Sequence, residues 1–340
     1  MPPYSASGPP TLPAEDDRPH LPLSAFTRLD WLDADVPWIA IGTAEIDGAK
    51  CSTELLEEVL RAAIRRGIRV IDTAPNYYGG LAESCVGRVI ASTKGALDNT
   101  YVLTKVGQLT DNEMRERDGR ALAHPGQHWC FEGQFLEMSI ARSMRRLGKA
   151  QLDCVLLHNP EDAIGAGEKA DQVLAEAVIT LEKMCREKKI RGWGIASWSG
   201  FYRSPGSAGS IQLGEFCRFL GREYGKHHFV TIELPMGLWN LHEFDARCQV
   251  GWKGLPGNMS VAEAASALGI NLLLSSPFCG GAAIPRRSSG NTWLTAAQHA
   301  LLRTRACAPR SLRIVGIRSY RSVQETTTLL ENADRAFKEL

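Results

Sequence analysis

Several features that would point to nucleic-acid binding or to a membrane are missing from this 340-residue sequence. Neither sign of charge is in excess, because 39 basic residues face 38 acidic ones and leave a formal net charge of +1. A nucleic-acid surface or an anionic membrane would call for a basic excess. No apolar run approaches the roughly 20 residues that span a bilayer, and the amino-terminus lacks the charged-then-apolar order of a signal peptide. We therefore expect a cytoplasmic protein whose partner is a small molecule and which requires no oligomer.

Disulfide and metal patterns are also lacking. The nine cysteines are odd in number and scattered, which is typical of reduced thiols in a core. His124, His128 and Cys130 offer three donors, but they have no paired CxxC and no evident fourth ligand. We predict that the protein holds no metal.

Short apolar runs alternate with helical patterns along most of the chain. One helical pattern covers Thr53 to Arg66, with Ser52 as its N-cap and Gly67 in the left-handed position that closes it, and another covers Phe131 to Leu147. The strand-like runs are WIAIG, IRVIDTA, YVLTKVG, LDCVLLH, IRGWGIAS, FVTIELP, NLLLSSP and LRIVGIR. Strict alternation predicts parallel strands joined by right-handed crossovers, and eight strands favour a closed (β/α)8 TIM barrel. No GxGxxG follows the first run, which disfavours an open doubly wound sheet.

The first stretch of the chain is different. It combines proline, glycine, serine and acidic residues without a periodic apolar face. We predict a flexible leader over residues 1–30 and a single barrel domain over residues 31–340, with ordered structure beginning near Trp38.

Polar residues stand at the carboxyl ends of several predicted strands. Asp72, Lys105, His158 and Ser197 occupy such positions, where a strand buried on both faces should otherwise be apolar. All carboxyl ends of a closed barrel meet at one rim, so these residues should converge. Asp72 and Lys105 alone could form a structural ion pair, whereas a group that also includes His158 and a tyrosine indicates a site.

The loop after Asp72 should place a tyrosine side chain at this rim. Tyr77 and Tyr78 both lie in the segment TAPNYYGG. A phenol normally keeps its proton to a pH near 10, and a neighbouring ammonium such as Lys105 stabilises the phenolate. The tyrosine could then protonate a carbonyl oxygen that His158 orients. No side chain supplies a hydride, so this chemistry implies a nicotinamide cofactor.

These motifs resemble the aldo-keto reductase superfamily from about Trp38 to the final helix. The motifs are IDTA followed by Y and ES, LTKVG, MRRLGKAQLDCVLLHNPE, KKIRGWGIAS, LLSSPFCGG and RIVGIRS. The resemblance implies a catalytic tetrad of Asp72, Tyr77, Lys105 and His158, with tyrosine as the general acid. In the family the tyrosine lies five residues after the aspartate and directly before a glycine. Tyr77 meets the first condition and Tyr78 the second, and we favour Tyr77 because its distance from the strand sets its reach.

The resemblance also implies where the cofactor should lie. Ser197 would contact the carboxamide, and Glu233 and Ser275 stand where the family commonly has a glutamine and an aromatic residue. The phosphates would lie over the segment from Ser276 to Gly281, with Arg286 and Arg287 nearby. Within this segment, the residues implied to contact the cofactor are Ser276, Pro277, Phe278 and Gly280. The adenosine end would meet Gly316 to Glu325, where Arg318 or Arg321 could replace the family's basic residue at a 2′-phosphate. The resemblance thus favours NADP(H), with NAD(H) as the alternative.

The function that follows is an NAD(P)-dependent oxidoreductase of aldehydes, ketones or sugar hemiacetals. The wording DTAPNYYGG and LLHNPE is similar to the sugar-dehydrogenase branch, such as arabinose and galactose dehydrogenases. Tyr78, Trp198 and Trp239 are candidates for lining the substrate pocket. A nucleotide-binding regulatory protein with slow or vestigial activity, like the potassium-channel β subunits, is the alternative. A lyase with Lys105 as a Schiff-base nucleophile is disfavoured by the spacing of Asp72 and Tyr77.

Overall fold

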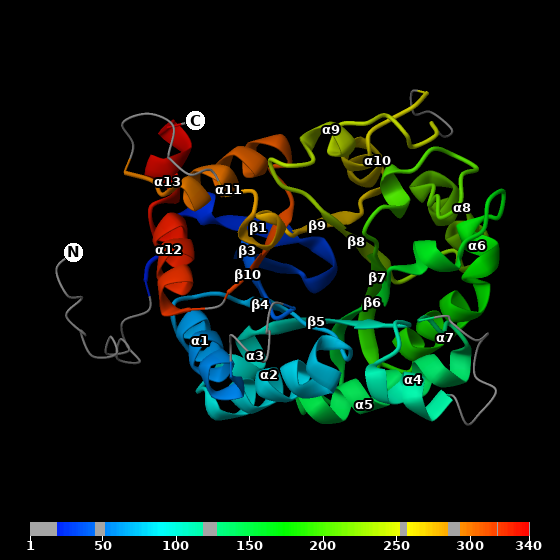
Figure 1. Ribbon diagram of the computed structural model, residues 1–340, viewed down its shortest axis with the longest axis horizontal. Helices are drawn as coiled ribbons and strands as arrows, with labels where there is room; N and C mark the ends of the chain where they lie inside the picture. Colours follow the sequence, from blue (N-terminus) through cyan, green and yellow to red (C-terminus); the bar gives the residue numbers. More distant parts are fainter. Residues whose placement is uncertain are drawn as a thin grey trace.

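Eight parallel strands form a closed barrel in the order β10-β3-β4-β5-β6-β7-β8-β9 (Figure 1). The computed structural model describes residues 19–44, 52–117, 128–251, 257–284, 293–317 and 319–339. The barrel strands are β3 (Ile39–Gly42), β4 (Val70–Asp72), β5 (Tyr101–Val106), β6 (Leu152–His158), β7 (Ile190–Ala196), β8 (Phe229–Pro235), β9 (Asn271–Ser275) and β10 (Leu312–Gly316). All eight predicted strands are confirmed, and the predicted barrel is confirmed with them.

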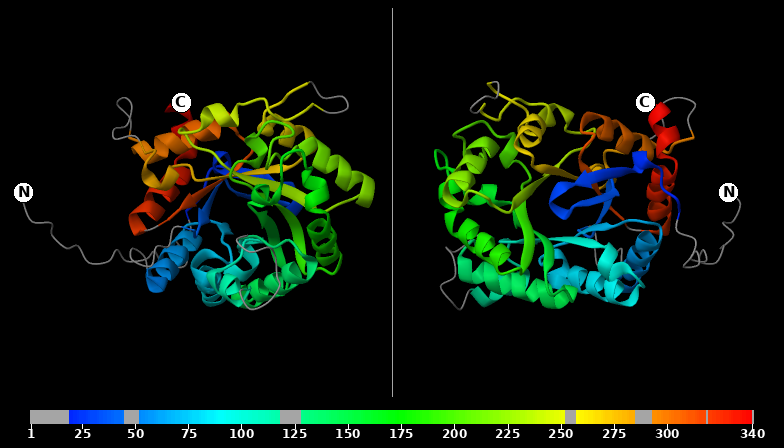
Figure 2. Two further views of the ribbon diagram at one scale, coloured as in Figure 1. Left: turned by 45° about the vertical axis from the view of Figure 1, so that its right-hand side comes forward. Right: turned by 180° about the vertical axis from the view of Figure 1, so that it is seen from behind.

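Helices surround the barrel and cover the outer faces of its strands (Figures 1 and 2). They are α1 (Thr53–Arg65), α2 (Leu81–Ser92), α3 (Ala96–Asn99), α4 (Asp111–Arg117), α5 (Gly133–Leu147), α6 (Ala170–Val173), α7 (Ala175–Arg186), α8 (Leu213–Tyr224), α9 (Leu241–Phe244), α10 (Val261–Leu268), α11 (Ala296–Cys307), α12 (Tyr320–Glu331) and α13 (Ala333–Ala336). The main core lies between these helices and the barrel wall. No helix in the described ranges is long and apolar enough to cross a membrane.

Helix α1 shows how local signals set its ends. The Ser52 side chain accepts a hydrogen bond from the Leu55 amide at 3.2 Å, and this bond satisfies one of the unpaired donors of the first turn. Gly67 follows the helix with φ of +93°, where a residue with a Cβ would be strained. Leu56, Val59, Leu60 and Ala63 are buried on one face of the helix. The predicted cap and closing glycine are therefore both present, and the helix has one apolar face toward the core.

An antiparallel hairpin precedes the barrel and was not expected from the sequence. Strands β1 (Phe26–Leu29) and β2 (Ala34–Pro37) pair with each other. Leu29 and Val36 of the hairpin are buried in one cluster with Val70 and Leu312, which begin β4 and β10. The hairpin therefore covers the amino-terminal end of the barrel (Figure 2, right). The predicted leader boundary at residue 30 is too late, because this end of the barrel needs an apolar cover and residues 26–29 provide part of it.

The packing of α2 on α5 allows a test of stability away from the rim. A Cβ on Gly87 of α2 would lie 2.3 Å from the Arg146 carbonyl oxygen of α5. We expect Gly87→Ala to lower the free energy of unfolding by about 1–3 kcal/mol, because the two helix backbones would have to separate. Urea unfolding followed by circular dichroism measures this change.

Gly221 provides the matched control, because it lies inside α8 and a Cβ there would meet no atom within 4 Å. Gly221→Ala should raise the free energy of unfolding by up to about 1 kcal/mol through helix propensity alone. Equal effects of the two alanines would contradict the close contact between α2 and α5.

Candidate active site

The four residues of the expected tetrad lie together at the carboxyl rim of the barrel. Asp72 ends β4, Lys105 lies near the end of β5 and His158 ends β6. Tyr77 begins a short 3₁₀ turn after β4, Tyr77–Gly80. The parallel register brings the strands to the same level, since Asp72 pairs with Leu103 and Lys105 pairs with Leu156. All four side chains line one cavity of about 430 Å³.

Lys105 is the centre of this cluster. Its Nζ donates to Asp72 Oδ1 at 2.5 Å and to the Thr73 carbonyl oxygen at 3.3 Å, and it lies 3.4 Å from Glu233 Oε2. The lysine side chain is 1% exposed. Burial acts to lower the pKa of Lys105, but the carboxylates of Asp72 and Glu233 outweigh burial and raise that pKa well above its ordinary value. The ammonium is therefore charged over the whole neutral range.

The pKa of Asp72 is shifted in opposite directions by a negatively charged neighbour, Glu233, and a positively charged one, Lys105. Burial and the nearby Glu233 carboxylate raise the pKa of Asp72 to about 7, against the opposing effect of Lys105. Above that pH the carboxylate is ionised and forms the direct ion pair with Lys105.

Tyr77 is held between Lys105 and His158. Lys105 Nζ lies 5.2 Å from the centroid of the Tyr77 ring, and the His158 ring meets it edge-on at 6.1 Å between centroids. Burial raises the pKa of Tyr77 above its ordinary value, although Lys105 acts to lower it. Burial and the Lys105 charge hold the pKa of His158 well below its ordinary value. At neutral pH the site therefore contains a protonated phenol beside a neutral imidazole.

Glu233 contributes an interaction that the sequence analysis did not anticipate. The resemblance placed it where the family commonly has a glutamine, and in the structure it is a second carboxylate at Lys105. Glu233 is 7% exposed and lines the cavity. Its Oε2 has no hydrogen-bond partner among the described residues. A buried, unsatisfied acceptor facing a cavity fits a ligand that brings a donor or a positive charge.

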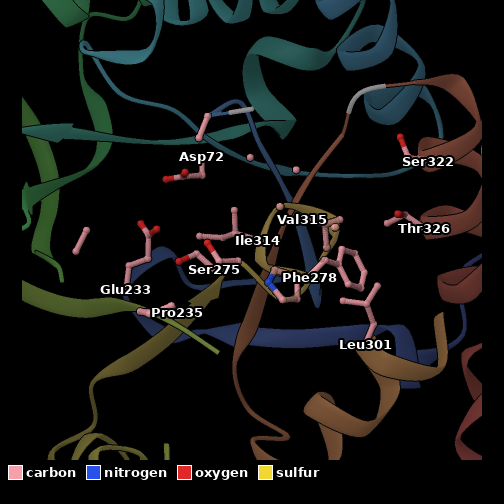
Figure 3. A pocket seen from close by; sticks show the side chains of 18 of the residues that line it. Asp72, Glu233, Pro235, Ser275, Phe278, Leu301, Ile314, Val315, Ser322 and Thr326 are labelled. Atoms are coloured by element: carbon pink, nitrogen blue, oxygen red, sulfur yellow. The ribbon is translucent and has the colours of Figure 1, made fainter. Parts of the chain in front are cut away.

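The cavity continues from this cluster toward α12. Asp72 and Glu233 lie at one end of it and Ser322 and Thr326 at the other, with Phe278 and Leu301 along its wall (Figure 3). Gly280 and Gly281 also line the cavity, with φ of +65° and +98°, and a Cβ on either would meet no atom within 4 Å. The expected cofactor residues that line the cavity are Ser197, Glu233, Ser276, Pro277, Phe278, Gly280, Gly316 and Glu325. A cavity that extends from a titratable cluster to α12 and is lined by open glycines fits an extended dinucleotide.

Some expected site residues do not line this cavity. Tyr78 has a left-handed backbone with φ of +57°, and its side chain packs against the hydrophobic core. Trp239 donates from Nε1 to the Ser276 carbonyl oxygen at 3.0 Å and stacks on Trp198, which does line the cavity. Arg321 is 86% exposed and pairs with Glu325 at 2.9 Å. Tyr78, Trp239 and Arg321 are therefore not among the residues that line this cavity.

Other expectations fall partly or wholly outside the described residues. Arg318, Arg286, Arg287 and His124 lie there, as do residues 1–18 of the predicted leader. Ser197 is described and has a structural contact as well, because its Oγ accepts a hydrogen bond from the Gly200 amide at 2.8 Å. Among the described residues, no group of three or more His, Cys, Asp or Glu side chains could hold a metal ion.

Several lining residues were missed by the sequence analysis. Asn159 directly follows His158, so its place after a strand end was a usable signal. Others lie on α11, where no local pattern distinguishes a cavity-facing side chain from a core one. They are Ala297, Gln298 and Leu301.

The protein is a closed (β/α)8 barrel. Its titratable cluster lies at the carboxyl ends of the strands and lines a cavity, which is where proteins of this class carry their sites. Within this class, residues 38–202 match the model of the Aldo/keto reductase family. The resemblance stated from the motifs is thus confirmed.

Curated relatives match part of the chain, and solved structures share its fold. The chain is 33% identical over 177 residues to D-threo-aldose 1-dehydrogenase of a Pseudomonas species, covering 48% of this chain and 50% of that protein. It is 31% identical over 137 residues to L-galactose dehydrogenase of Arabidopsis thaliana, covering 40% of this chain and 36% of that protein. The matched region thus spans about half, or less, of these relatives. The fold is similar to an aldo/keto reductase of Klebsiella pneumoniae solved in complex with NADP and acetate, with a TM-score of 0.59, 21% identity and coverage of 92% of this chain and 94% of that one.

Proposed function

We propose that this protein is an NAD(P)-dependent oxidoreductase, of the type that interconverts an aldehyde, ketone or sugar hemiacetal with its alcohol or lactone. The observation that carries the proposal is the buried cluster in which Lys105 contacts Asp72 at 2.5 Å and faces the Tyr77 ring at one end of the cavity. A lysine held charged beside a protonated phenol is suited to proton transfer at a carbonyl oxygen.

Tyr77 is the proton donor in this proposal. Its phenol keeps its proton at neutral pH because burial raises its pKa, so the proton is available when negative charge develops on a carbonyl oxygen. The phenolate left behind is stabilised by the Lys105 ammonium, which is already present and does not have to reorganise. Asp72 holds Lys105 in place through the direct ion pair.

His158 orients the substrate in this proposal. Its lowered pKa keeps the imidazole neutral, so it can donate one hydrogen bond to the carbonyl oxygen without competing with Tyr77 as an acid. The ring lies edge-on to Tyr77, and both side chains line the same end of the cavity. A carbonyl oxygen at this end would therefore meet two donors.

A bound nicotinamide cofactor would supply or accept the hydride. The ring would have to lie at the Lys105 end, near Ser197 and Glu233, because the hydride and the proton go to neighbouring atoms of one carbonyl. The segment from Ser276 to Gly281 would hold the phosphates through backbone amides. Ser319, Ser322 and Glu325 would face the adenosine end at the start of α12, and we favour NADP(H) because this helix N-terminus attracts an additional phosphate.

Sugars are the substrate class that we favour. The two dehydrogenases to which the chain is similar are named for an aldose and for galactose. Trp198 is 54% exposed, lines the cavity and stacks on Trp239 with 6.4 Å between ring centroids. A flat apolar face next to polar donors suits the alternating apolar and hydroxyl faces of a sugar ring.

A fluorescence titration with NADPH and NADH, followed by a panel of aldehydes and aldoses, tests the proposal. Binding with turnover supports the oxidoreductase and ranks both nucleotides and substrates. Binding without turnover would favour the regulatory alternative, and no binding would overturn the proposal.

The two directions of the reaction should depend differently on pH. Oxidation needs the Tyr77 phenolate to accept a proton, and burial places the pKa of Tyr77 above its ordinary value. Between pH 8 and 10, above the pKa of about 7 of Asp72, oxidation should rise roughly tenfold per pH unit. Reduction starts from the protonated phenol and should change by less than about threefold. Initial rates for one substrate pair in both directions measure this, and a flat oxidation rate would exclude a buried tyrosine as the proton acceptor.

A further inference from the structure

The end of the cavity beside Lys105 carries one more negative charge than its lysine balances. Asp72 and Glu233 both face Lys105 Nζ, at 2.5 and 3.4 Å, and all three side chains are at least nine-tenths buried. Lys105 is the only positively charged side chain among the described residues that line the cavity. His158 is neutral at this end of the cavity, because its pKa is lowered. With both carboxylates ionised, the cluster therefore has a net charge of −1.

Glu233 is the carboxylate that remains available to a ligand. Asp72 is bound directly by Lys105, whereas Glu233 Oε2 is buried without a hydrogen-bond partner among the described residues. Glu233 lies on β8, pairs in register with Leu273 of β9 and lines the cavity together with Ser197 and Pro235. The carboxylate and Asp72 lie at the same end of the cavity (Figure 3).

We propose that Glu233 makes the nicotinamide end of the cavity distinguish between the two redox states of the cofactor and favour the oxidised one. This inference rests on the proposed function. A nicotinamide ring carries a positive charge when oxidised and none after it has accepted a hydride, that is, one proton and two electrons. A buried carboxylate attracts the charged ring and has little interaction with the neutral one, and burial reduces the screening of this attraction.

The same preference affects the hydride-transfer step. The charge that Glu233 stabilises appears on the ring when the carbonyl is reduced and disappears when the alcohol is oxidised. By thermodynamic linkage, the factor by which the oxidised cofactor binds more tightly equals the factor by which the equilibrium on the protein moves toward the alcohol. Glu233 would thus hold the oxidised cofactor in the resting protein and also favour carbonyl reduction within the bound complex.

Glu233→Gln tests this inference, because glutamine has nearly the same shape and no charge. Dissociation constants of the full-length protein for NADP⁺ and NADPH are measured by calorimetry at pH 8.5, where Asp72 is ionised. We expect the ratio of the NADPH constant to the NADP⁺ constant to fall about tenfold in the variant. Glu233→Asp keeps the charge and should keep most of the wild-type ratio.

Glu325→Gln is the matched control, because it removes a carboxylate from the other end of the same cavity. It should change both dissociation constants together and leave their ratio within about twofold. A ratio in Glu233→Gln within twofold of wild type, with both nucleotides still binding, would overturn this inference and leave the proposed function standing. Failure of the wild-type protein to bind either nucleotide would overturn both.

Discussion

Replacing Tyr77 with phenylalanine is expected to lower kcat by about 10²- to 10⁴-fold, the range that positioned acid catalysts contribute. Phenylalanine keeps the ring that lies between Lys105 and His158 and removes only the ionisable oxygen. The dissociation constant for NADPH should therefore stay within about threefold of wild type. Steady-state kinetics and a fluorescence titration on the same preparation measure the two effects.

Tyr78→Phe is the matched control for this prediction. Tyr78 is the neighbouring tyrosine, but its side chain packs against the core and does not line the cavity. Its loss of the hydroxyl should change kcat by less than about threefold. A large loss at Tyr78 with retained turnover in Tyr77→Phe would reassign the proton donor and would contradict the observed placement of the two rings.

Replacing Lys105 with methionine is expected to lower the free energy of unfolding by about 3–5 kcal/mol, because two buried carboxylates lose their shared cation. Methionine fills a similar volume, so the effect comes chiefly from charge. Lys105 lowers the pKa of Asp72, and its removal raises that pKa further above the unfolded value. A carboxyl group with a raised pKa destabilises the folded protein above its unfolded pKa. The loss should thus be larger at pH 8.5 than at pH 5, where Asp72 takes up a proton.

Lys183→Met provides the comparison for this loss. Lys183 pairs with Glu137 at 2.7 Å, but the two side chains are 48% and 44% exposed, and such pairs contribute at most about 1 kcal/mol. Adding Glu233→Gln to Lys105→Met should recover part of the lost stability, because only one buried carboxylate then remains. Urea unfolding at both pH values measures all three variants. A loss that is equal at pH 5 and pH 8.5 would mean that packing, and not charge, causes it.

The alternation of apolar runs and helices was sufficient to predict the barrel. Strands β6, β7 and β8 are buried along most of their length, which favours mainly apolar runs and leaves a strong signal in a single sequence. The hairpin of β1 and β2 was missed because its strands have four residues each and are buried on one side by contacts with the distant starts of β4 and β10. No local pattern records which end of a barrel needs a cover.

The tetrad could be expected from the sequence because strand ends meet at one rim in any closed parallel barrel. Asp72, Lys105 and His158 therefore had to converge once the strands were identified. The choice between Tyr77 and Tyr78 was less certain, because both lie in one loop. In the structure Tyr77 lines the cavity, whereas Tyr78, which has a left-handed backbone, does not.

The sequence by itself thus determined the barrel, its strand ends and the chemical groups at its rim, because periodicity and strand direction are local properties that a fold of this class converts directly into position. Only the tertiary structure decided that Glu233 lies 3.4 Å from Lys105 and that α11 and α12 line the far end of the cavity. The reason is physical. The charge balance and the shape of the cavity depend on side chains that are far apart in the sequence; Lys105 and Glu233, for example, are 128 residues apart. The closure of the barrel sets the distances between such side chains, and no local sequence pattern records them.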